Sequence, residues 1–233
     1  MFKITLTAGH YRYQAGRRCL KKYDPNETRE WILNARVCDK VAKLLESYEG
    51  YSLIRTDDVT GEKEISLADR VKKANNFGAD IYISIHHNAG IYGGKGGGVT
   101  AYVYNKTKKQ ASLDWQKALY DNIIKHTGLK GNRATPLAKA NFQELRETTM
   151  PAVLLECGFM DSQTDIPIII TEDFTNKVAK AIVEVIVEKG KLTKKPVDDG
   201  KIYRVQVGAY KDRANAEKTL AKLKADGYDA IIV

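Results

Sequence analysis

Long apolar runs are missing from this chain of 233 residues. No stretch approaches the roughly 18 consecutive apolar residues that a membrane-spanning helix needs. The first residues, "MFKITLTAGH", are too short and too polar at Thr5 and Thr7 for a secretory signal peptide, and they read as a first strand instead. We therefore expect a protein without a membrane span that is synthesised in the cytoplasm without a signal peptide.

Cysteine and histidine are scarce, with three and four residues respectively. Cys19, Cys38 and Cys157 are widely spaced and form no CxxC pair, so the sequence does not indicate a cysteine-based zinc site or a redox dithiol. We expect reduced, buried thiols. Basic residues are abundant, and the formal net charge of +9 favours polyanionic partners such as nucleic acid, membrane surfaces or an anionic cell wall. No recognition motif accompanies the scattered charges, so we expect no nucleic-acid partner.

Predicted strands and helices alternate along most of the chain. Buried or alternating strand patterns occupy 2–8, 51–56, 79–90, 97–104 and 151–159. Helical patterns occupy 23–50, 66–78, 110–128 and 171–190, and Asp24 or Asn26 is a candidate cap for the first of them. This alternation predicts an α/β domain over 1–190, with a largely parallel mixed sheet flanked by helices.

The C-terminal part of the chain has a different composition. Residues 191–200, "KLTKKPVDDG", combine charge with proline and glycine, which predicts a linker. Residues 201–233 then predict strand, helix and strand, a small α+β piece with little room for a core of its own. The last 43 residues hold ten basic and six acidic side chains, so positive charge is densest there.

Candidate catalytic residues follow the predicted strands. His10, His86 and Glu156 each end a strand, and Glu30 lies in the first turns of the following helix. Ligands of open α/β sheets bind at the carboxyl ends of strands. Two histidines and a carboxylate are a common ligand set for a catalytic zinc, with an unligated glutamate as general base.

Each of these residues also has a structural interpretation. A histidine at a strand end is often only a hydrogen-bonding partner, and a glutamate that opens a helix favours the helix macrodipole. Glu156 follows the apolar "PAVLL", so its carboxylate must be paired, face a metal or be protonated if it is buried. His86 and His87 are neighbours on one strand and should point to opposite faces of the sheet.

Several ordered motifs resemble a known enzyme family. "TAGH", "REWILN", "DIYISIHHNAG" and "MPAVLLECGFM", with "RTDD" and "SLADRVKKAN" between them, are similar to the zinc-dependent N-acetylmuramoyl-L-alanine amidases of the Amidase_3 type. The resemblance covers about residues 1–188. It implies a twisted mixed sheet between helices, with one zinc ion at the strand ends.

The resemblance implies a role for each candidate residue. The zinc ligands fall on His10, Glu30 and His86, and the catalytic glutamate of the "ExGF" pattern falls on Glu156. His87 occupies a variable position, which implies a lining or surface residue. Glu27, three residues before Glu30, is an alternative ligand on the same predicted helix face. The loop 11–25 is longer and more basic than the family's glycine-rich loop, so the substrate-binding residues stay unknown.

The implied reaction is hydrolysis of the amide between the lactyl group of N-acetylmuramic acid and L-alanine of the stem peptide. Zinc would polarise the carbonyl and activate water, and Glu156 would accept the proton of that water. A zinc peptidase acting on the stem peptide is an alternative, and so is a non-catalytic wall-binding protein on the same scaffold. Without a signal peptide, an endolysin or mother-cell autolysin would reach the wall after lysis or through a holin.

The tail resembles one repeat of the sporulation-related (SPOR) domains, which bind peptidoglycan. The resemblance depends on "VQVGAY" and the spaced alanine, leucine and glycine residues after it. A complete domain of that family has two such repeats. The piece could pair with another molecule as a dimer, be a remnant that does not fold alone, or be a basic, partly disordered tail.

Overall fold

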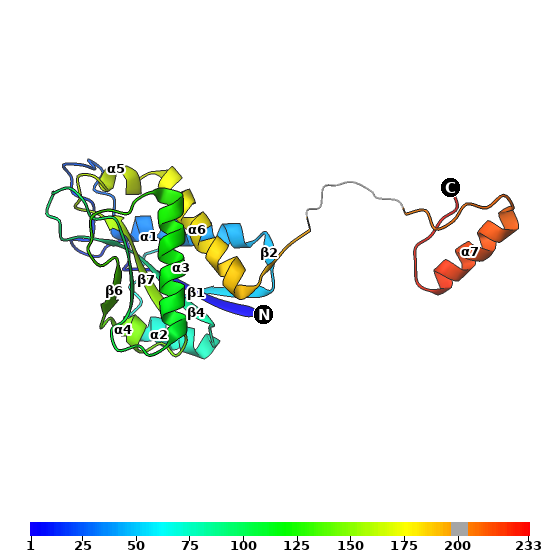
Figure 1. Ribbon diagram of the computed structural model, residues 1–233, viewed down its shortest axis with the longest axis horizontal. Helices are drawn as coiled ribbons and strands as arrows, with labels where there is room; N and C mark the ends of the chain where they lie inside the picture. The colour runs from blue at the N-terminus through cyan, green and yellow to red at the C-terminus, as the bar shows by residue number, and fades with distance from the viewer. Residues whose placement is uncertain (197–204) are drawn as a thin grey trace. The chain divides into compact units, whose positions relative to one another are not determined.

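The computed structural model describes residues 1–196 and 205–233 of the chain. They form two compact units, Met1–Lys195 and Pro196–Val233, which are treated separately below (Figure 1). Residues 197–204, including the end of the predicted linker and the start of the predicted tail piece, lie outside the described residues.

The first unit is built around one six-stranded sheet in the order β3-β1-β4-β7-β5-β6. The strands are β1 (Phe2–Ala8), β3 (Tyr51–Arg55), β4 (Ile81–Asn88), β5 (Val99–Tyr104), β6 (Leu137–Ala140) and β7 (Ala152–Phe159). The first four in this order run parallel, β5 pairs antiparallel with β7, and β6 runs parallel to β5. The predicted largely parallel mixed sheet is confirmed, and β6 is a strand that the sequence pattern did not indicate.

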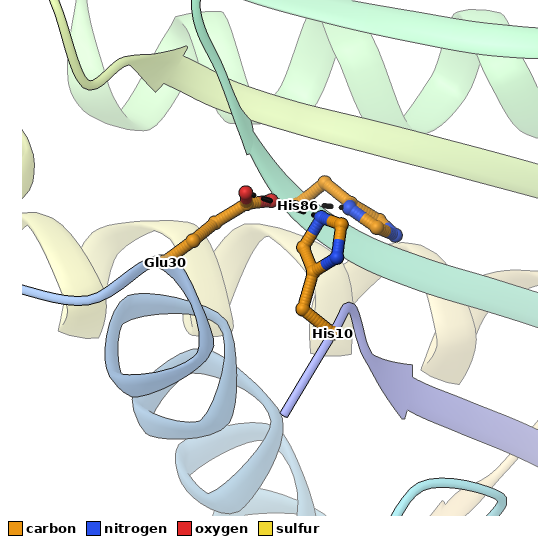
Figure 2. Close-up of side chains that lie close together, drawn as sticks. All are labelled: His10, Glu30 and His86. Carbon is orange, nitrogen blue, oxygen red and sulfur yellow. Dashed lines mark hydrogen bonds and ion pairs between the residues drawn. The ribbon is translucent and has the colours of Figure 1, made fainter. Parts of the chain in front are cut away.

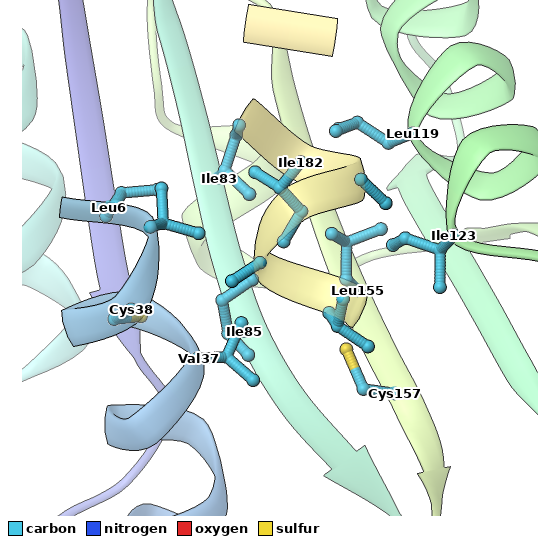
Figure 3. Close-up of a cluster of buried hydrophobic side chains, with 14 of the residues drawn as sticks. Leu6, Val37, Cys38, Ile83, Ile85, Leu119, Ile123, Leu155, Cys157 and Ile182 are labelled. Atoms are coloured by element: carbon cyan, nitrogen blue, oxygen red, sulfur yellow. The ribbon is translucent and has the colours of Figure 1, made fainter. Parts of the chain in front are cut away.

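Three long helices cover one face of the sheet: α1 (Glu30–Leu45), α3 (Gln110–Thr127) and α6 (Glu172–Gly190) (Figure 1). Alternate residues of the central strands, such as Ile83 and Ile85, pack with Val37 of α1 and Ile182 of α6 in a hydrophobic core (Figure 3). This near-continuous burial explains why the central strands read as apolar runs.

Two shorter helices, α2 (Leu67–Phe77) and α4 (Gln143–Arg146), lie on the other face. There Tyr82 of β4 and Leu154 of β7 pack with Ala74 of α2 and Leu145 of α4. Because side chains alternate along a strand, His86 belongs to this face with Tyr82, whereas His87 belongs to the face of the long helices. The parity of β4 therefore separates the two histidines.

Helix ends follow the expected capping chemistry in α2 but not in α1. Ser66 accepts a hydrogen bond from the Asp69 amide, and Gly78 ends α2 in the left-handed conformation, as predicted. The predicted α1 caps are wrong, because the helix begins only at Glu30. Asp24 instead accepts hydrogen bonds from the amides of Asn26 and Thr28, so its carboxylate stabilises a loop turn.

Further short elements complete the first unit. The helix α5 spans Ile166–Ile169, and β2 (Tyr48–Glu49) pairs antiparallel with β8 (Thr193–Lys194). Thus the first unit extends to Lys195, five residues beyond the domain boundary predicted at 190.

In the second unit, residues 205–233 form one helix, α7 (Arg213–Ala225), which Asp212 caps by accepting a hydrogen bond from the Ala214 amide. Residues 205–233 contain no strand, so the predicted strand–helix–strand pattern is wrong in this range. None of the residues of α7 is buried, and Val207 and Ile231 are exposed. A strand needs a partner for its backbone groups, and this short piece provides none. Within the described residues, no helix combines the length and apolar character that crossing a bilayer requires.

Candidate metal centre and catalytic site

The first predicted ligand, His10, follows the end of β1 and has a left-handed backbone with φ of 65°. Buried Arg70 of α2 holds this turn in place. Its Nη1 donates to the Ala8 carbonyl (2.6 Å) and to Thr7 Oγ1 (2.9 Å), and its Nη2 donates to the His10 carbonyl (2.8 Å). These bonds fix the backbone that presents the His10 imidazole.

Glu30 is the first residue of α1, and its amide donates to the Arg17 carbonyl (3.0 Å) of the preceding loop. The side chain is only 1% exposed and lies between two imidazoles (Figure 2). Oε2 is 3.1 Å from His10 Nε2, and Oε1 is 3.1 Å from His86 Nδ1. Burial opposes ionisation, but the hydrogen bonds and charges of the two histidines hold the pKa of Glu30 below its usual value.

His86 lies near the end of β4, where its ring packs directly on Gly9. A Cβ atom at Gly9 would lie 2.1 Å from His86 Cε1, so no larger residue fits there without movement. The rings of His10 and His86 meet edge to face with centroids 5.1 Å apart. Burial alone would lower the pKa of His86, but the hydrogen bond and charge of Glu30 raise it to about 9.

Together, His10, Glu30 and His86 offer three potential ligand atoms that lie within 4.8 Å of one another. The predicted ligands thus come from three elements that are far apart in the sequence. Two imidazole nitrogens and one carboxylate oxygen, all partly or fully buried, are a donor set that suits a catalytic zinc ion. The arrangement fits a metal ion, and the donor chemistry favours a transition metal over calcium or magnesium.

Comparison with known proteins identifies the family. The N-acetylmuramoyl-L-alanine amidase family matches residues 4–188 of this chain. The chain belongs to this family. A sporulation-specific N-acetylmuramoyl-L-alanine amidase of Bacillus subtilis is 33% identical over 192 residues, which cover 82% of this chain and 70% of the relative. An endolysin of Bacillus phage SPP1 is 35% identical over 195 residues, with 82% and 67% covered.

The amidase fold is confirmed by a solved structure. The catalytic domain of CwlV, an N-acetylmuramoyl-L-alanine amidase from Bacillus (Paenibacillus) polymyxa var. colistinus, superposes with a TM-score of 0.72 at 27% identity. The match covers 83% of this chain and all of that one. A SPOR domain also matches residues 174–233. This range includes most of α6, which belongs to the first unit, so only its later part lies in the second unit.

Glu156 lies on β7, the strand next to His86 of the predicted ligand cluster. It is paired in register with His86 across β4 and β7, and with Thr100 across β5 and β7. Its Oε2 atom is buried without a hydrogen-bond partner among the described residues. Burial raises the pKa of Glu156 to about 8, although the positive charge of His86 opposes the shift. A carboxyl group with a pKa near neutrality is suited to proton transfer.

His87 is not a surface or lining residue, contrary to the expectation from its variable position. It is 2% exposed and packs on the face of the long helices, where its Nδ1 lies 2.8 Å from Asn34 Oδ1. Burial lowers the pKa of His87 to about 4, so the ring is neutral at pH 7. Asn34 also donates to the Gly9 carbonyl (3.2 Å), which links His87 to the turn beneath His86.

Glu27 does not share a helix face with Glu30, because it precedes α1 and has a left-handed backbone with φ of 48°. Its carboxylate pairs with Arg18 Nε at 3.2 Å. The expectation that both glutamates lie on one helix face assumed that α1 begins earlier than it does. The geometry therefore favours Glu30 over Glu27 as the ligand.

Two residues of the site escaped the sequence analysis. Arg70 lies in the motif "SLADRVKKAN", which could have drawn attention to it, but a basic residue on a helix is normally exposed to solvent. Glu144 had no such signal, because α4 is only four residues long and shows no periodicity. Its Oε1 lies 3.8 Å from His86 Nε2.

Proposed function

We propose that this amidase-family protein is a zinc-dependent enzyme that hydrolyses the amide between the lactyl group of N-acetylmuramic acid and L-alanine in peptidoglycan. One observation carries the proposal: His10, Glu30 and His86 gather three ligand atoms within 4.8 Å, next to the half-buried Glu156. The name of the sporulation-specific N-acetylmuramoyl-L-alanine amidase supports the same reaction.

His10, Glu30 and His86 would hold the ion. When bound there, zinc would supply a Lewis acid that activates water and polarises the scissile carbonyl. The low pKa of Glu30 keeps this carboxylate charged, as a ligand must be. Arg70 fixes the His10 turn, and Gly9 allows the His86 ring to approach.

Glu156 would act as the general base and then as the general acid. Its carboxylate accepts a proton from the attacking water and delivers that proton to the amide nitrogen as the bond to carbon breaks. The nitrogen leaves as the free amino group of L-alanine. Because Glu156 Oε2 has no hydrogen-bond partner within residues 1–196 and 205–233, this atom is available for the transfer.

Metal analysis of two matched variants tests the ligand set. Glu30→Gln should lose bound zinc, because an amide replaces the only carboxylate of the cluster, whereas Glu27→Gln should bind one zinc ion per chain like the wild type. Both proteins should first be shown to fold by circular dichroism. Zinc loss in Glu27→Gln alone, or a wild type that binds no zinc, would overturn the assignment.

The second unit is proposed to bind the cell wall, since part of the SPOR-domain match lies there. Its exposed apolar residues, such as Val207 and Ile231, would gain partners if two copies paired into a dimer, and its basic charge would favour anionic wall polymers. Wall pull-down and analytical ultracentrifugation of the full chain and of residues 1–195 test this proposal. Equal wall binding by both proteins would argue against it.

A zinc peptidase that cuts the stem peptide would use the same zinc and glutamate chemistry, so product analysis must separate the two. An amidase frees amino groups on L-alanine alone. A non-catalytic wall-binding protein would release none, and the complete set of candidate residues argues against this alternative.

A further inference from the structure

Glu144 places a third carboxylate at the site, beside the buried Glu30 and the half-buried Glu156. The side chain is 3% exposed and comes from α4, on the sheet face where His86 lies. Among the described residues, its one ion-pair partner is His86, with Oε1 at 3.8 Å from Nε2. Both of these atoms are buried, and neither has a hydrogen-bond partner in the described part of the chain.

Apolar side chains lie close to Glu144 on this face of the sheet. The neighbouring Leu145 packs with Tyr82 and Leu154 in an apolar cluster. Burying a carboxylate without a partner costs free energy, so the charge needs a compensating donor. Nε2 of His86, the ion-pair partner of Glu144, can provide that donor.

The two nitrogens of His86 face different carboxylates. Nδ1 points to Glu30, whereas Nε2 points away from Glu30 (Figure 2) and lies near Glu144. A histidine ligates a metal through an unprotonated nitrogen, so ligation through Nδ1 requires the ring proton on Nε2. In this buried position, that proton needs an acceptor, and ligating histidines commonly donate their second N–H to a carboxylate.

We propose that Glu144 is a positioning residue that accepts the Nε2 proton of His86 and so directs the Nδ1 lone pair toward the metal cluster. The inference rests on the proposed function, since it assumes that His86 is a ligand. At 3.8 Å the contact is longer than a hydrogen bond, and a side-chain movement of about 1 Å closes it.

Metal affinity of matched variants tests the proposal. In competition with a chromophoric chelator, Glu144→Met should bind zinc about 10–100-fold more weakly than the wild type. Glu144→Gln should recover part of this loss, because its amide oxygen still accepts a hydrogen bond. Glu147→Gln, on the same segment but exposed, should bind zinc like the wild type. Equal zinc affinity in Glu144→Met and the wild type would overturn the proposal.

Two further measurements separate positioning from a general role in folding. Without zinc, Glu144→Met should unfold at the same temperature as the wild type or above it, because an apolar side chain replaces a buried charge. Nitrogen-15 NMR of the zinc-loaded wild type should show His86 protonated at Nε2, and protonation at Nδ1 would refute the proposal without any variant. A wild type that binds no zinc would refute the proposed function itself.

Discussion

The contact between Gly9 and the His86 ring yields the sharpest prediction, for the variant Gly9→Ala. The new Cβ would lie 2.1 Å from Cε1 and 2.4 Å from both ring nitrogens of His86, whereas ordinary contacts begin near 3.4 Å. The ring must therefore move by about 1 Å, and a displacement of that size at a catalytic group typically costs about 100-fold in rate. Overpacking of this kind also lowers the free energy of unfolding by about 1–3 kcal/mol.

The assay measures zinc affinity and release of amino groups from peptidoglycan for Gly9→Ala and for a matched control. Gly94→Ala serves as the control, because its new Cβ would approach the Ile91 carbonyl oxygen only to 3.1 Å, a tight contact but a far milder one than 2.1 Å at Gly9. We expect Gly9→Ala to bind zinc at least 10-fold more weakly and Gly94→Ala to behave like the wild type. Wild-type zinc affinity and turnover in Gly9→Ala would refute the account of how His86 is held.

Three further variants probe other parts of the site. Arg70→Lys should lower the free energy of unfolding in urea by about 2–4 kcal/mol, because an ammonium group cannot replace all the hydrogen bonds of Arg70 to Ala8, Thr7 and His10. A smaller loss of stability than in an exposed Lys→Ala control would contradict the role of Arg70 in holding this turn. Glu156→Gln should retain zinc but hydrolyse peptidoglycan about 10²–10⁴-fold more slowly, and near-normal turnover would remove its role as base. The pKa of His87 is about 4 in the fold against an ordinary 6.5, so the unfolded chain takes up the proton first as pH falls. Relative to His87→Gln, the wild type should lose up to about 3 kcal/mol of stability between pH 6.5 and 4, and parallel pH profiles would contradict a buried neutral ring.

The periodic parts of the fold were predictable from the sequence. The buried strands β4 and β7 and the helices α2 and α6 have clear apolar patterns with capping residues at their ends. Patterns of this kind report burial directly, so the mixed α/β sheet followed from them. The start of α1 could not be predicted in this way, because the turn at Asp24 has the same residue types as a helix cap.

Short elements and the tail were not predictable in the same way. The helix α4 and the strand β6 have four residues each, too few for a period to show, and their positions depend on contacts with distant strands. In the tail, residues such as Val207 have strand-like patterns but no partner in the second unit. Strand formation requires such a partner, which a local pattern cannot supply.

The residues of the candidate site were likewise predictable only in part. His10, His86 and Glu156 follow strand ends, so topology alone suggested that they converge, and the structure brings the two histidines together around Glu30. Glu144 approaches His86 from a loop-like segment, and no spacing rule connects the two residues. The burial of His87 could not be predicted either, because the alternation of side chains along a strand shows which face of the sheet a residue lies on but not what covers that face.

Product analysis tests the central claim most directly. The full chain is incubated with purified peptidoglycan, with and without a zinc chelator, and the newly exposed amino groups are identified by labelling and hydrolysis. The account predicts amino groups on L-alanine alone, lost with the chelator and restored when zinc is added back. Amino groups at another position of the stem peptide, or release that the chelator does not affect, would contradict it.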